Sequence, residues 1–234
     1  MNNPRHVALI PDGNRRWAKA KGKPAAFGHE AGARALDPIL REALALHIPY
    51  VTFWGASVGN VTKRSKTEVA FLYALFAKYF LSLAKSKEIK ENRVRIRVLG
   101  RWEEHFSAPA KKAIRQAIEA TKTHDRFHLT FLLAYSGADE MLSAMRDIAS
   151  RKIQDPKLEI DEAVIKDHLW TRELPPVDLV IRTGGEPHWS QGFMMWDVAN
   201  SQLCFTETLW PAFGPKEFQA AVKKFSETER RMGK

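Results

Sequence analysis

Short apolar runs recur along the chain, and their length and composition predict buried strands. They are His6–Ile10, Tyr50–Ala56, Val94–Leu99, His128–Tyr135, Leu179–Arg182 and Gln202–Thr206. Longer segments with apolar residues at helical spacing separate these runs and predict helices. They are Gly28–His47, Lys66–Lys90, Ala108–Thr123, Gly137–Lys152, Ile160–Leu169 and Pro215–Arg231. This alternation is typical of a mostly parallel sheet covered by helices on both faces.

Right-handed crossovers in such a sheet place the carboxyl ends of the strands, and the loops after them, along one edge. Polar residues that follow the strands are therefore expected to meet at that edge. No internal repeat, low-complexity tract or linker interrupts the alternation. The pattern predicts a single α/β domain over residues 1–234.

The segment Lys66–Lys90 differs from the other predicted helices because its central turns carry apolar residues on nearly every side. They are Phe71, Leu72, Leu75, Phe76, Tyr79, Phe80 and Leu83. A helix of this kind is buried on several sides or lines an apolar cavity. Taken alone, the segment favours a place in the core.

The composition is that of a globular protein, with 44% hydrophobic and 27% charged residues. The formal net charge of +10 favours anionic partners such as phosphates, nucleic acid or an anionic membrane surface. The lysines are spread through several predicted helices and no nucleic-acid-binding module is recognisable, so we do not expect a nucleic-acid partner.

Cysteine usage and hydropathy indicate where the protein works. The single cysteine, Cys204, excludes an internal disulfide and a four-cysteine zinc site, and it fits a reducing cytoplasm. The N-terminus lacks the apolar core of a signal peptide, and no run approaches the roughly 18 apolar residues of a spanning helix. We therefore expect a soluble, cytoplasmic protein.

A cluster of polar residues separates the first predicted strand from the helix that follows it. It consists of Asp12, Gly13, Asn14, Arg15 and Arg16. Backbone N–H groups and cationic side chains that face one spot are the chemistry of a diphosphate site. An Asp-Gly turn with solvated arginines is the alternative.

Further polar clusters follow other predicted strands. His29 lies in the first turn of the next predicted helix, where it can donate to an anion or act only as a local cap. The second strand is followed by Ser57, Asn60 and Lys63. The fifth leads into Arg182-Thr183-Gly184-Gly185-Glu186, a second candidate anion cradle. Two such sites beside an apolar helix indicate a substrate that is both phosphorylated and apolar.

Four stretches resemble the signatures of the cis-prenyltransferases, the undecaprenyl diphosphate synthase family. They are Asp12-Gly13-Asn14-Arg15-Arg16-Trp17-Ala18, Gly28-His29-Glu30-Ala31-Gly32, Asp178-Leu179-Val180-Ile181-Arg182-Thr183-Gly184-Gly185-Glu186 and Leu209-Trp210-Pro211. They occur in the family's order and spacing, so the resemblance covers essentially the whole chain.

The resemblance implies a six-stranded, mostly parallel sheet flanked by helices and an apolar tunnel, with Lys66–Lys90 as a tunnel wall rather than a core helix. It further implies a homodimer that joins isopentenyl diphosphate to an allylic prenyl diphosphate with Mg²⁺, forming a Z double bond. The apolar product implies peripheral contact with a membrane. Small Gly55 would leave room in the tunnel, whereas Phe71, Phe76 or Phe80 would each close it.

The same resemblance assigns roles to individual residues. Asp12 would hold Mg²⁺ and help proton removal, and Ser57 and Asn60 would lie beside the condensation centre. The allylic diphosphate would be bound by residues of the first two motifs, namely Gly13, Asn14, Arg15, Arg16, Trp17 and His29. Lys63 would also contact substrate, and the isopentenyl diphosphate side would be formed by Arg182, Glu186, His188 and Ser190. An apolar pocket would then shelter the developing carbocation from water.

Several positions depart from the family pattern. Ala25 and Gly59 stand where the family has an arginine and an acid, and His188 stands where it has a second arginine. Gln202 replaces the glutamate that binds magnesium across the dimer, so we expect lower metal affinity.

Most of these losses fall on the isopentenyl diphosphate side, while Asp12, Arg16 and His29 on the allylic side are intact. Three functions fit such a sequence. The first is regular cis-prenyl transfer, and the second is head-to-middle coupling of allylic diphosphates, as in lavandulyl-type synthases. The third is a non-catalytic prenyl-diphosphate-binding or partner subunit.

Overall fold

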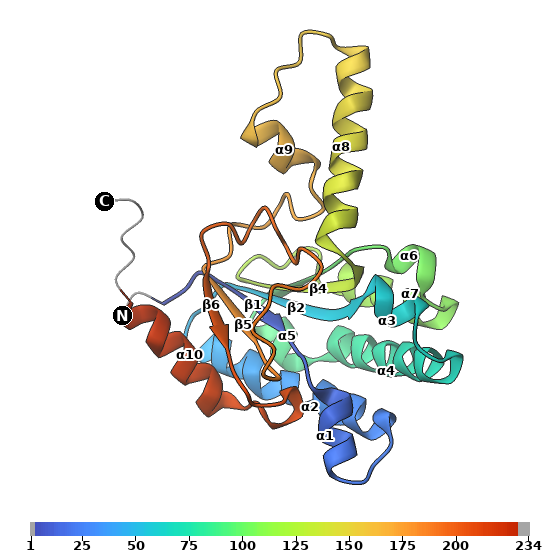
Figure 1. Cartoon of the computed structure of the whole chain (residues 1–234), viewed down its shortest axis with the longest axis vertical. Helices are drawn as coiled ribbons and strands as arrows, with labels where there is room; N and C mark the ends of the chain where they lie inside the picture. Colours follow the sequence, from blue (N-terminus) through green and yellow to red (C-terminus); the bar gives the residue numbers. More distant parts are fainter. Residues whose placement is uncertain (1–2, 229–234) are drawn as a thin grey trace.

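The computed structural model describes residues 3–228, and its centre is a six-stranded sheet in which every pairing is parallel (Figure 1). The strands are β1 (His6–Ile10), β2 (Tyr50–Ser57), β3 (Val94–Leu99), β4 (Phe127–Tyr135), β5 (Leu179–Arg182) and β6 (Gln202–Phe205). Their order across the sheet is β3-β4-β2-β1-β5-β6. This confirms the predicted six-stranded sheet flanked by helices, and the strand bounds differ from the predicted ones by at most one residue.

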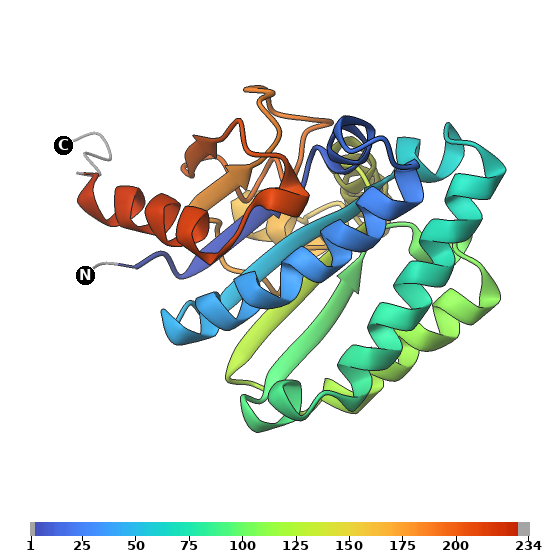
Figure 2. The same ribbon diagram turned by 90° about the horizontal axis from the view of Figure 1, so that it is seen from below.

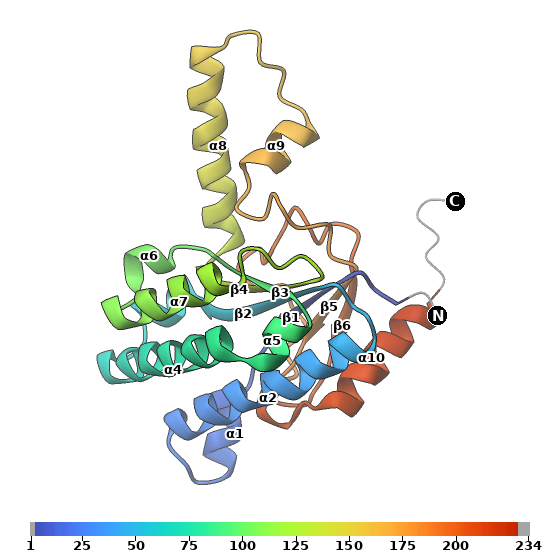
Figure 3. The same cartoon turned by 180° about the vertical axis from the view of Figure 1, so that it is seen from behind.

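The helices are distributed unevenly over the sheet. They are α1 (Asn14–Ala20), α2 (Ala25–Ala45), α3 (Val58–Thr62), α4 (Lys66–Lys85), α5 (Lys87–Glu91), α6 (Trp102–His105), α7 (Ala108–Thr121), α8 (Gly137–Gln154), α9 (Glu162–His168), the 3₁₀ turn η1 (Trp210–Ala212) and α10 (Pro215–Glu227). Helices α10, α2, α4 and α7 cross one face of the sheet (Figure 2). On the other face α8 and α9 stand away from the sheet (Figures 1 and 3), so irregular chain between β5 and β6 covers much of it.

Two apolar cores follow from this arrangement, because side chains alternate between the two faces of a strand. Val7 and Leu9 of β1 belong to the larger core under α2, α4, α7 and α10. Ala8 and Ile10 belong to the smaller core on the opposite face, with Phe193 from the irregular segment. Burial of each large side chain contributes about 1.5–3 kcal/mol. Both faces of β1 are therefore anchored, and its carboxyl end is held firmly.

The predicted helix Lys66–Lys90 is in fact two helices. Ser86 leaves the helical conformation (φ −67°, ψ 123°), and its hydroxyl accepts a hydrogen bond from the Ile89 N–H, which starts α5. A side-chain cap of this kind competes with continuation of the helix. At the other end of the chain, α10 ends at Glu227, and the predicted extension over residues 229–231 lies outside the described residues.

Helix α4 is also long and apolar enough to cross a membrane by length and composition alone, with a mean hydropathy of 1.3. The expectation that no segment approaches this limit was therefore wrong. Core helices of soluble proteins pass the same test. Here α4 packs between α2 and α7, where Leu72, Phe80 and Leu83 are buried, although only 17% of its apolar stretch is buried inside the protein.

Candidate active site

A cavity of about 240 Å³ opens where β1, β2 and β5 end. Its polar end is lined by Asp12, Asn14, His29, Ser57, Asn60, Arg64, Arg182, Ser190 and Gln191. Its apolar end runs between the sheet and α4 and is lined by Leu36, Phe53, Leu72, Leu75, Phe76, Tyr79, Phe131 and Trp210, among others. Such a cavity has room for a molecule with a charged head and a hydrocarbon tail. α4 supplies one wall of it, as the resemblance implied.

A second, more open depression of about 530 Å³ adjoins the polar end, and we call it the cationic hollow. Its positive side chains are Arg15, Arg16, Lys19, Lys23 and Arg64. Among residues 3–228, no carboxylate lies within ion-pair distance of Arg15, Lys19 or Lys23. The hollow also contains Ala25, where the sequence lacks the family's arginine, so neighbouring lysines supply positive charge at that place.

Two glycines let the loop after β1 lie against the segments that follow β5 and β6. Gly13 has φ 109°, and a Cβ there would lie 2.7 Å from Leu209 Cδ2. Gly184 has φ +93°, and a Cβ there would lie 3.1 Å from the Asp12 carbonyl oxygen. Both conformations are rarely adopted by residues with a side chain. The Thr183 hydroxyl joins the loops, because it donates to the Asp12 carbonyl (2.8 Å) and accepts from the Asp12 N–H (2.9 Å).

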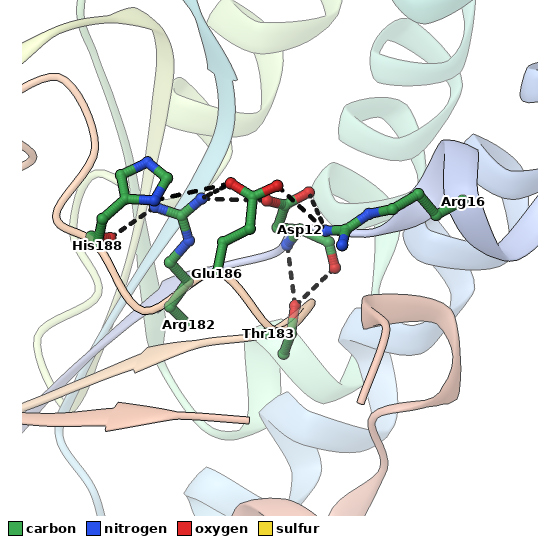
Figure 4. A network of polar contacts seen from close by, with 6 residues as sticks. All are labelled: Asp12, Arg16, Arg182, Thr183, Glu186 and His188. Atoms are coloured by element: carbon green, nitrogen blue, oxygen red, sulfur yellow. Dashed lines mark hydrogen bonds and ion pairs between the residues drawn. The ribbon is translucent and has the colours of Figure 1, made fainter. Parts of the chain in front are cut away.

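The side chain of Asp12 lies between two guanidinium groups (Figure 4). Arg16 Nη2 is 3.3 Å from Asp12 Oδ1, and Arg182 Nη2 is 3.2 Å from Asp12 Oδ2. Arg182 also contacts Glu186 Oε2 at 3.0 Å and donates to the His188 carbonyl at 2.6 Å. The Arg182 side chain is only 5% exposed, so two carboxylates compensate one buried cation. We call Arg182, Glu186 and His188 the β5 rim.

His29 is a buried residue of α2 that lines the cavity and forms a hydrogen bond with the carboxylate of Glu68. Its Nε2 lies 3.0 Å from Glu68 Oε1, which Arg64 Nη1 also approaches at 3.2 Å. Burial lowers the pKa of His29 despite the hydrogen bond to Glu68. Burial would raise the pKa of Glu68, but the hydrogen bond from His29 and the charge of Arg64 outweigh it and lower that pKa. His29 is therefore a neutral hydrogen-bond donor at neutral pH.

Arg64 takes the position that the sequence suggested for Lys63. Arg64 lines both the cavity and the cationic hollow, whereas Lys63 is exposed and is not among the residues that line either. The spacing of Arg64 and Glu68, four residues apart at a helix start, is the signal that sequence reasoning missed. Gln191 in the polar end was also not predicted.

Ser57 and Asn60 hold each other in place at the start of α3. The Asn60 N–H donates to Ser57 Oγ (3.1 Å), and the Ser57 N–H donates to Asn60 Oδ1 (3.2 Å). This reciprocal capping box fixes both side chains on the cavity wall. Their presence has a structural reason, and their chemical role stays a prediction.

Not every predicted residue reaches the cavities. Trp17 stacks on Phe27, with ring centroids 5.6 Å apart, and lies outside the residues that line them. The side chains of Glu186 and His188 are 48% and 57% exposed at the β5 rim. Gln202 begins β6 and pairs with the first residue of β5, at the opposite end of the strands from Asp12. A metal bound by both Asp12 and Gln202 would have to lie between two copies of the chain.

The donors of the site fit one class of metal site. No group of three or more His, Cys, Asp or Glu side chains that could hold a metal occurs among residues 3–228. Mg²⁺ commonly uses one or two carboxylates together with substrate phosphates and water. Asp12 is 34% exposed at the junction of the cavity and the hollow, which suits this mode of binding.

Comparisons with known proteins agree with this geometry. The sequence model described as "Putative undecaprenyl diphosphate synthase" matches residues 10–233. The tritrans,polycis-undecaprenyl-diphosphate synthase (geranylgeranyl-diphosphate specific) of Pyrococcus abyssi is 38% identical over 99% of this chain and 87% of its own length. The isoprenyl transferase of Thermotoga maritima is 37% identical over 100% of this chain and 98% of its own.

A similar solved structure is lavandulyl diphosphate synthase from Lavandula x intermedia in complex with dimethylallyl diphosphate. It superimposes with a TM-score of 0.90 at 30% sequence identity, and the match covers 99% of each chain.

Proposed function

The chain belongs to the undecaprenyl diphosphate synthase family and is a cis-prenyltransferase, and from this premise we propose the reaction. It condenses isopentenyl diphosphate with an allylic prenyl diphosphate and gives a Z-prenyl diphosphate in a Mg²⁺-dependent step. One observation carries the proposal. The cationic hollow, the carboxylate of Asp12 and a cavity with an apolar end meet at one edge of the sheet.

The cationic hollow is assigned to the allylic diphosphate. Arg15, Lys19 and Lys23 offer charges with no carboxylate of the described residues within ion-pair distance. Positive charge on the leaving diphosphate favours ionisation of the allylic carbon, and the hydrocarbon tail then lies in the apolar end of the cavity. The walls contributed by α4 and β2 exclude water from the developing carbocation.

Asp12 and the β5 rim are assigned to the second substrate and the metal. Asp12 would hold Mg²⁺ together with diphosphate oxygens, and the ion would neutralise the charge that builds up as diphosphate leaves. Arg182 orients the Asp12 carboxylate and, with Ser190, faces the isopentenyl diphosphate. A proton must leave the isopentenyl unit when the new double bond forms, and we assign its removal to Asp12, Ser57 and Asn60, which line the cavity.

Head-to-middle coupling of two allylic diphosphates is the second candidate. Two observations favour it: the similarity to a lavandulyl diphosphate synthase, and the cancellation of the Arg182 charge by Asp12 and Glu186. The retained Asp12–Arg182 pair argues against a non-catalytic subunit.

We also propose a homodimer. Leu203 and Phe205 of the edge strand β6 are 51% and 39% exposed, and Leu142 and Met145 of α8 are 46% and 59% exposed. Exposed apolar side chains beside an open strand edge are commonly covered by a partner. We expect the protein to work in the cytoplasm, with its apolar product bringing it to the membrane surface.

The test is product analysis with the purified chain. Labelled isopentenyl diphosphate is incubated with Mg²⁺ and, separately, dimethylallyl, geranyl, farnesyl and geranylgeranyl diphosphate, and the extracted products are sized. Incorporation with at least one primer, abolished by EDTA, is expected for the regular reaction. A product from dimethylallyl diphosphate alone would establish the coupling reaction instead, and no product in any mixture would contradict both.

A further inference from the structure

A hollow of about 360 Å³ lies along β3, the edge strand at the opposite side of the sheet from β6. We call it the edge hollow. Its walls are β3 itself, Ile118 and Lys122 at the end of α7, and residues 170–174, which follow α9. None of its lining residues also lines the active-site cavity or the cationic hollow. It is therefore a separate space, and it has room for a small organic molecule.

Two arginines stand on the face of β3 that lines the edge hollow. Val94, Ile96 and Val98 enter the larger core on the face covered by α7. Side chains alternate along a strand, so Arg95 and Arg97 lie on the opposite face, where α8 and α9 stand away from the sheet (Figure 3). Strands of a parallel sheet are usually apolar on both faces. The core gives no reason for two arginines at this place, which favours a role toward an anion.

Positive charge exceeds negative charge in the edge hollow. Three arginines line it, Arg95, Arg97 and Arg172, and Glu173 is the one carboxylate among its lining residues. Glu173 Oε2 is 3.0 Å from Arg97 Nε and 3.8 Å from Arg95 Nη2. Within residues 3–228, no carboxylate lies within ion-pair distance of Arg172. Two arginines thus share one acid and the third has none, whereas Lys122 is already paired in the last turn of α7.

Two neighbouring groups respond to this positive charge. The hydrogen bond from Arg97 lowers the pKa of Glu173, and the charges of the arginines add to it although burial opposes them. Arg97 Nη1 also lies 2.8 Å from His128 Nδ1. Burial lowers the pKa of His128, and the charges of Arg97 and Arg95 lower it further. His128 is therefore a neutral acceptor that orients Arg97 and compensates none of the charge.

The wall beside the arginines is apolar. Trp170 is half-buried, and its ring meets the ring of Tyr135 edge-on, with centroids 6.0 Å apart and planes at 68°. Leu99 and Leu174 pack with Trp170 in the smaller core. Inorganic phosphate would leave this wall in contact with water, whereas an apolar or aromatic group would cover it. The lining thus combines groups for an anion with groups for an organic substituent.

We propose that the edge hollow is a binding site for a phosphate ester, whose phosphate group lies on the three arginines and whose organic part lies against Trp170. The proposal goes beyond the proposed function, because none of these residues is assigned to either substrate. Guanidinium groups present paired N–H donors that match phosphate oxygens. Arg172 can receive the anion directly, and Arg95 can turn to it from its longer contact with Glu173.

The experiment is isothermal titration calorimetry of the full-length protein with phenyl phosphate in the absence of Mg²⁺. We expect two sites, the edge hollow and the cationic hollow. Arg95→Gln/Arg172→Gln should weaken one of them about tenfold or more, and Lys19→Ala/Lys23→Ala should weaken the other. Inorganic phosphate should bind the edge hollow less tightly than phenyl phosphate. Two arginines that are not in contact with His128 are replaced, so that the support of Arg97 is kept.

Two further variants separate the site from general charge and from misfolding. Arg41→Gln/Arg115→Gln removes the same net charge from exposed pairs elsewhere and should leave both sites unchanged. Glu173→Gln removes the carboxylate that competes with the ligand and should tighten the edge hollow about three- to tenfold, which a damaged fold would not do. Unchanged binding in Arg95→Gln/Arg172→Gln, an equal loss in Arg41→Gln/Arg115→Gln, or weaker binding in Glu173→Gln would overturn the proposal.

The same phosphate chemistry is offered by a soluble ester and by the head group of an anionic lipid. Sedimentation with vesicles of phosphatidylglycerol and of phosphatidylcholine distinguishes them. Retention on phosphatidylglycerol that is lost in Arg95→Gln/Arg172→Gln but kept in Arg41→Gln/Arg115→Gln would identify the lipid as the source. Equal retention of both variants, together with the calorimetric loss, would identify a soluble ester. Absence of an effect of the hollow arginines in both experiments would refute the site.

Discussion

On the α1–α2 side of the active site, the cationic hollow gathers Arg15, Lys19 and Lys23 with no carboxylate of the described chain within ion-pair distance. On the β5 side, Arg182 is buried and already shared between Asp12 and Glu186. The first side can receive a diphosphate as it stands. The second must exchange protein carboxylates for substrate oxygens before its arginine is available.

The hollow and the buried Arg182 therefore represent two ways of binding a diphosphate. Surplus positive charge near the surface attracts anions over a distance and depends on salt concentration. A buried, compensated arginine contributes little attraction but places its partners accurately. We therefore expect changes on the β5 side to affect the chemical step and changes in the hollow to affect substrate binding.

The largest effect is expected from Asp12→Asn. The change keeps the shape of the side chain but removes the charge that we assign to Mg²⁺ and to the compensation of Arg182. We expect kcat to fall about 100- to 1000-fold, the range for loss of one preorganised charged group at a reacting centre. Initial rates at saturating substrates measure it.

Asp125→Asn is the matched control for this variant. Asp125 pairs with Arg93 on the surface and is 74% exposed, so its loss should leave kcat unchanged. Urea unfolding of both variants shows whether the fold is retained. A folded Asp12→Asn protein with wild-type kcat would remove Asp12 from the mechanism and end the distinction between the two sides.

A smaller effect is expected from the hollow. Lys19→Ala and Lys23→Ala each remove one uncompensated charge, and we expect each to raise the KM for the allylic diphosphate about three- to tenfold with kcat little changed. The increase should shrink at high salt, because added ions already screen the hollow. Steady-state kinetics at low and high ionic strength measure both effects.

Lys21, the C-cap residue of α1, is the control. Its ammonium lies 4.8 Å from the centre of the Trp17 ring and is not among the residues that line the hollow. Lys21→Ala should therefore leave the KM for the allylic diphosphate unchanged. If all three lysine variants behave alike, general surface charge rather than the hollow explains the binding.

The sheet could be predicted from sequence because short continuous apolar runs are typical of strands that are buried on both faces of a parallel sheet. The runs at β1, β3 and β5 match the observed strands residue for residue. The division between α4 and α5 was not predicted, since a single serine cap at Ser86 interrupts a segment that otherwise looks continuously helical. Local side-chain hydrogen bonds of this kind are weak signals in a hydropathy pattern.

The candidate site was predictable only as far as motifs place residues at strand ends. Asp12 and Arg182 meet in one cavity because parallel strands end at one edge, and His29 reaches the same cavity from α2. Whether a side chain at that edge points inward depends on helix phase, which separates Arg64 from Lys63 and Tyr79 from Phe80. Helix phase follows from tertiary packing, and the sequence pattern of α4 is apolar on too many sides to reveal it.

The smallest effect concerns pH, and it tests whether His29 adds to the charge of the hollow. Burial lowers the pKa of His29 below its ordinary value of 6.5. Near pH 6.5 the unfolded chain therefore binds a proton at His29 more readily than the folded chain does. The free energy of unfolding should therefore fall as pH falls from 7 through 6.5 toward the lower, folded pKa. His29→Gln keeps a donor to Glu68 and should flatten this slope, measured by urea unfolding at several pH values. His6, whose pKa burial lowers to about 4, also lowers the free energy of unfolding at low pH, but it does so equally in both proteins and cancels in their difference. Equal slopes would mean that folding does not change the pKa of His29, and His29 would then add positive charge to the hollow as the pH falls through its ordinary range.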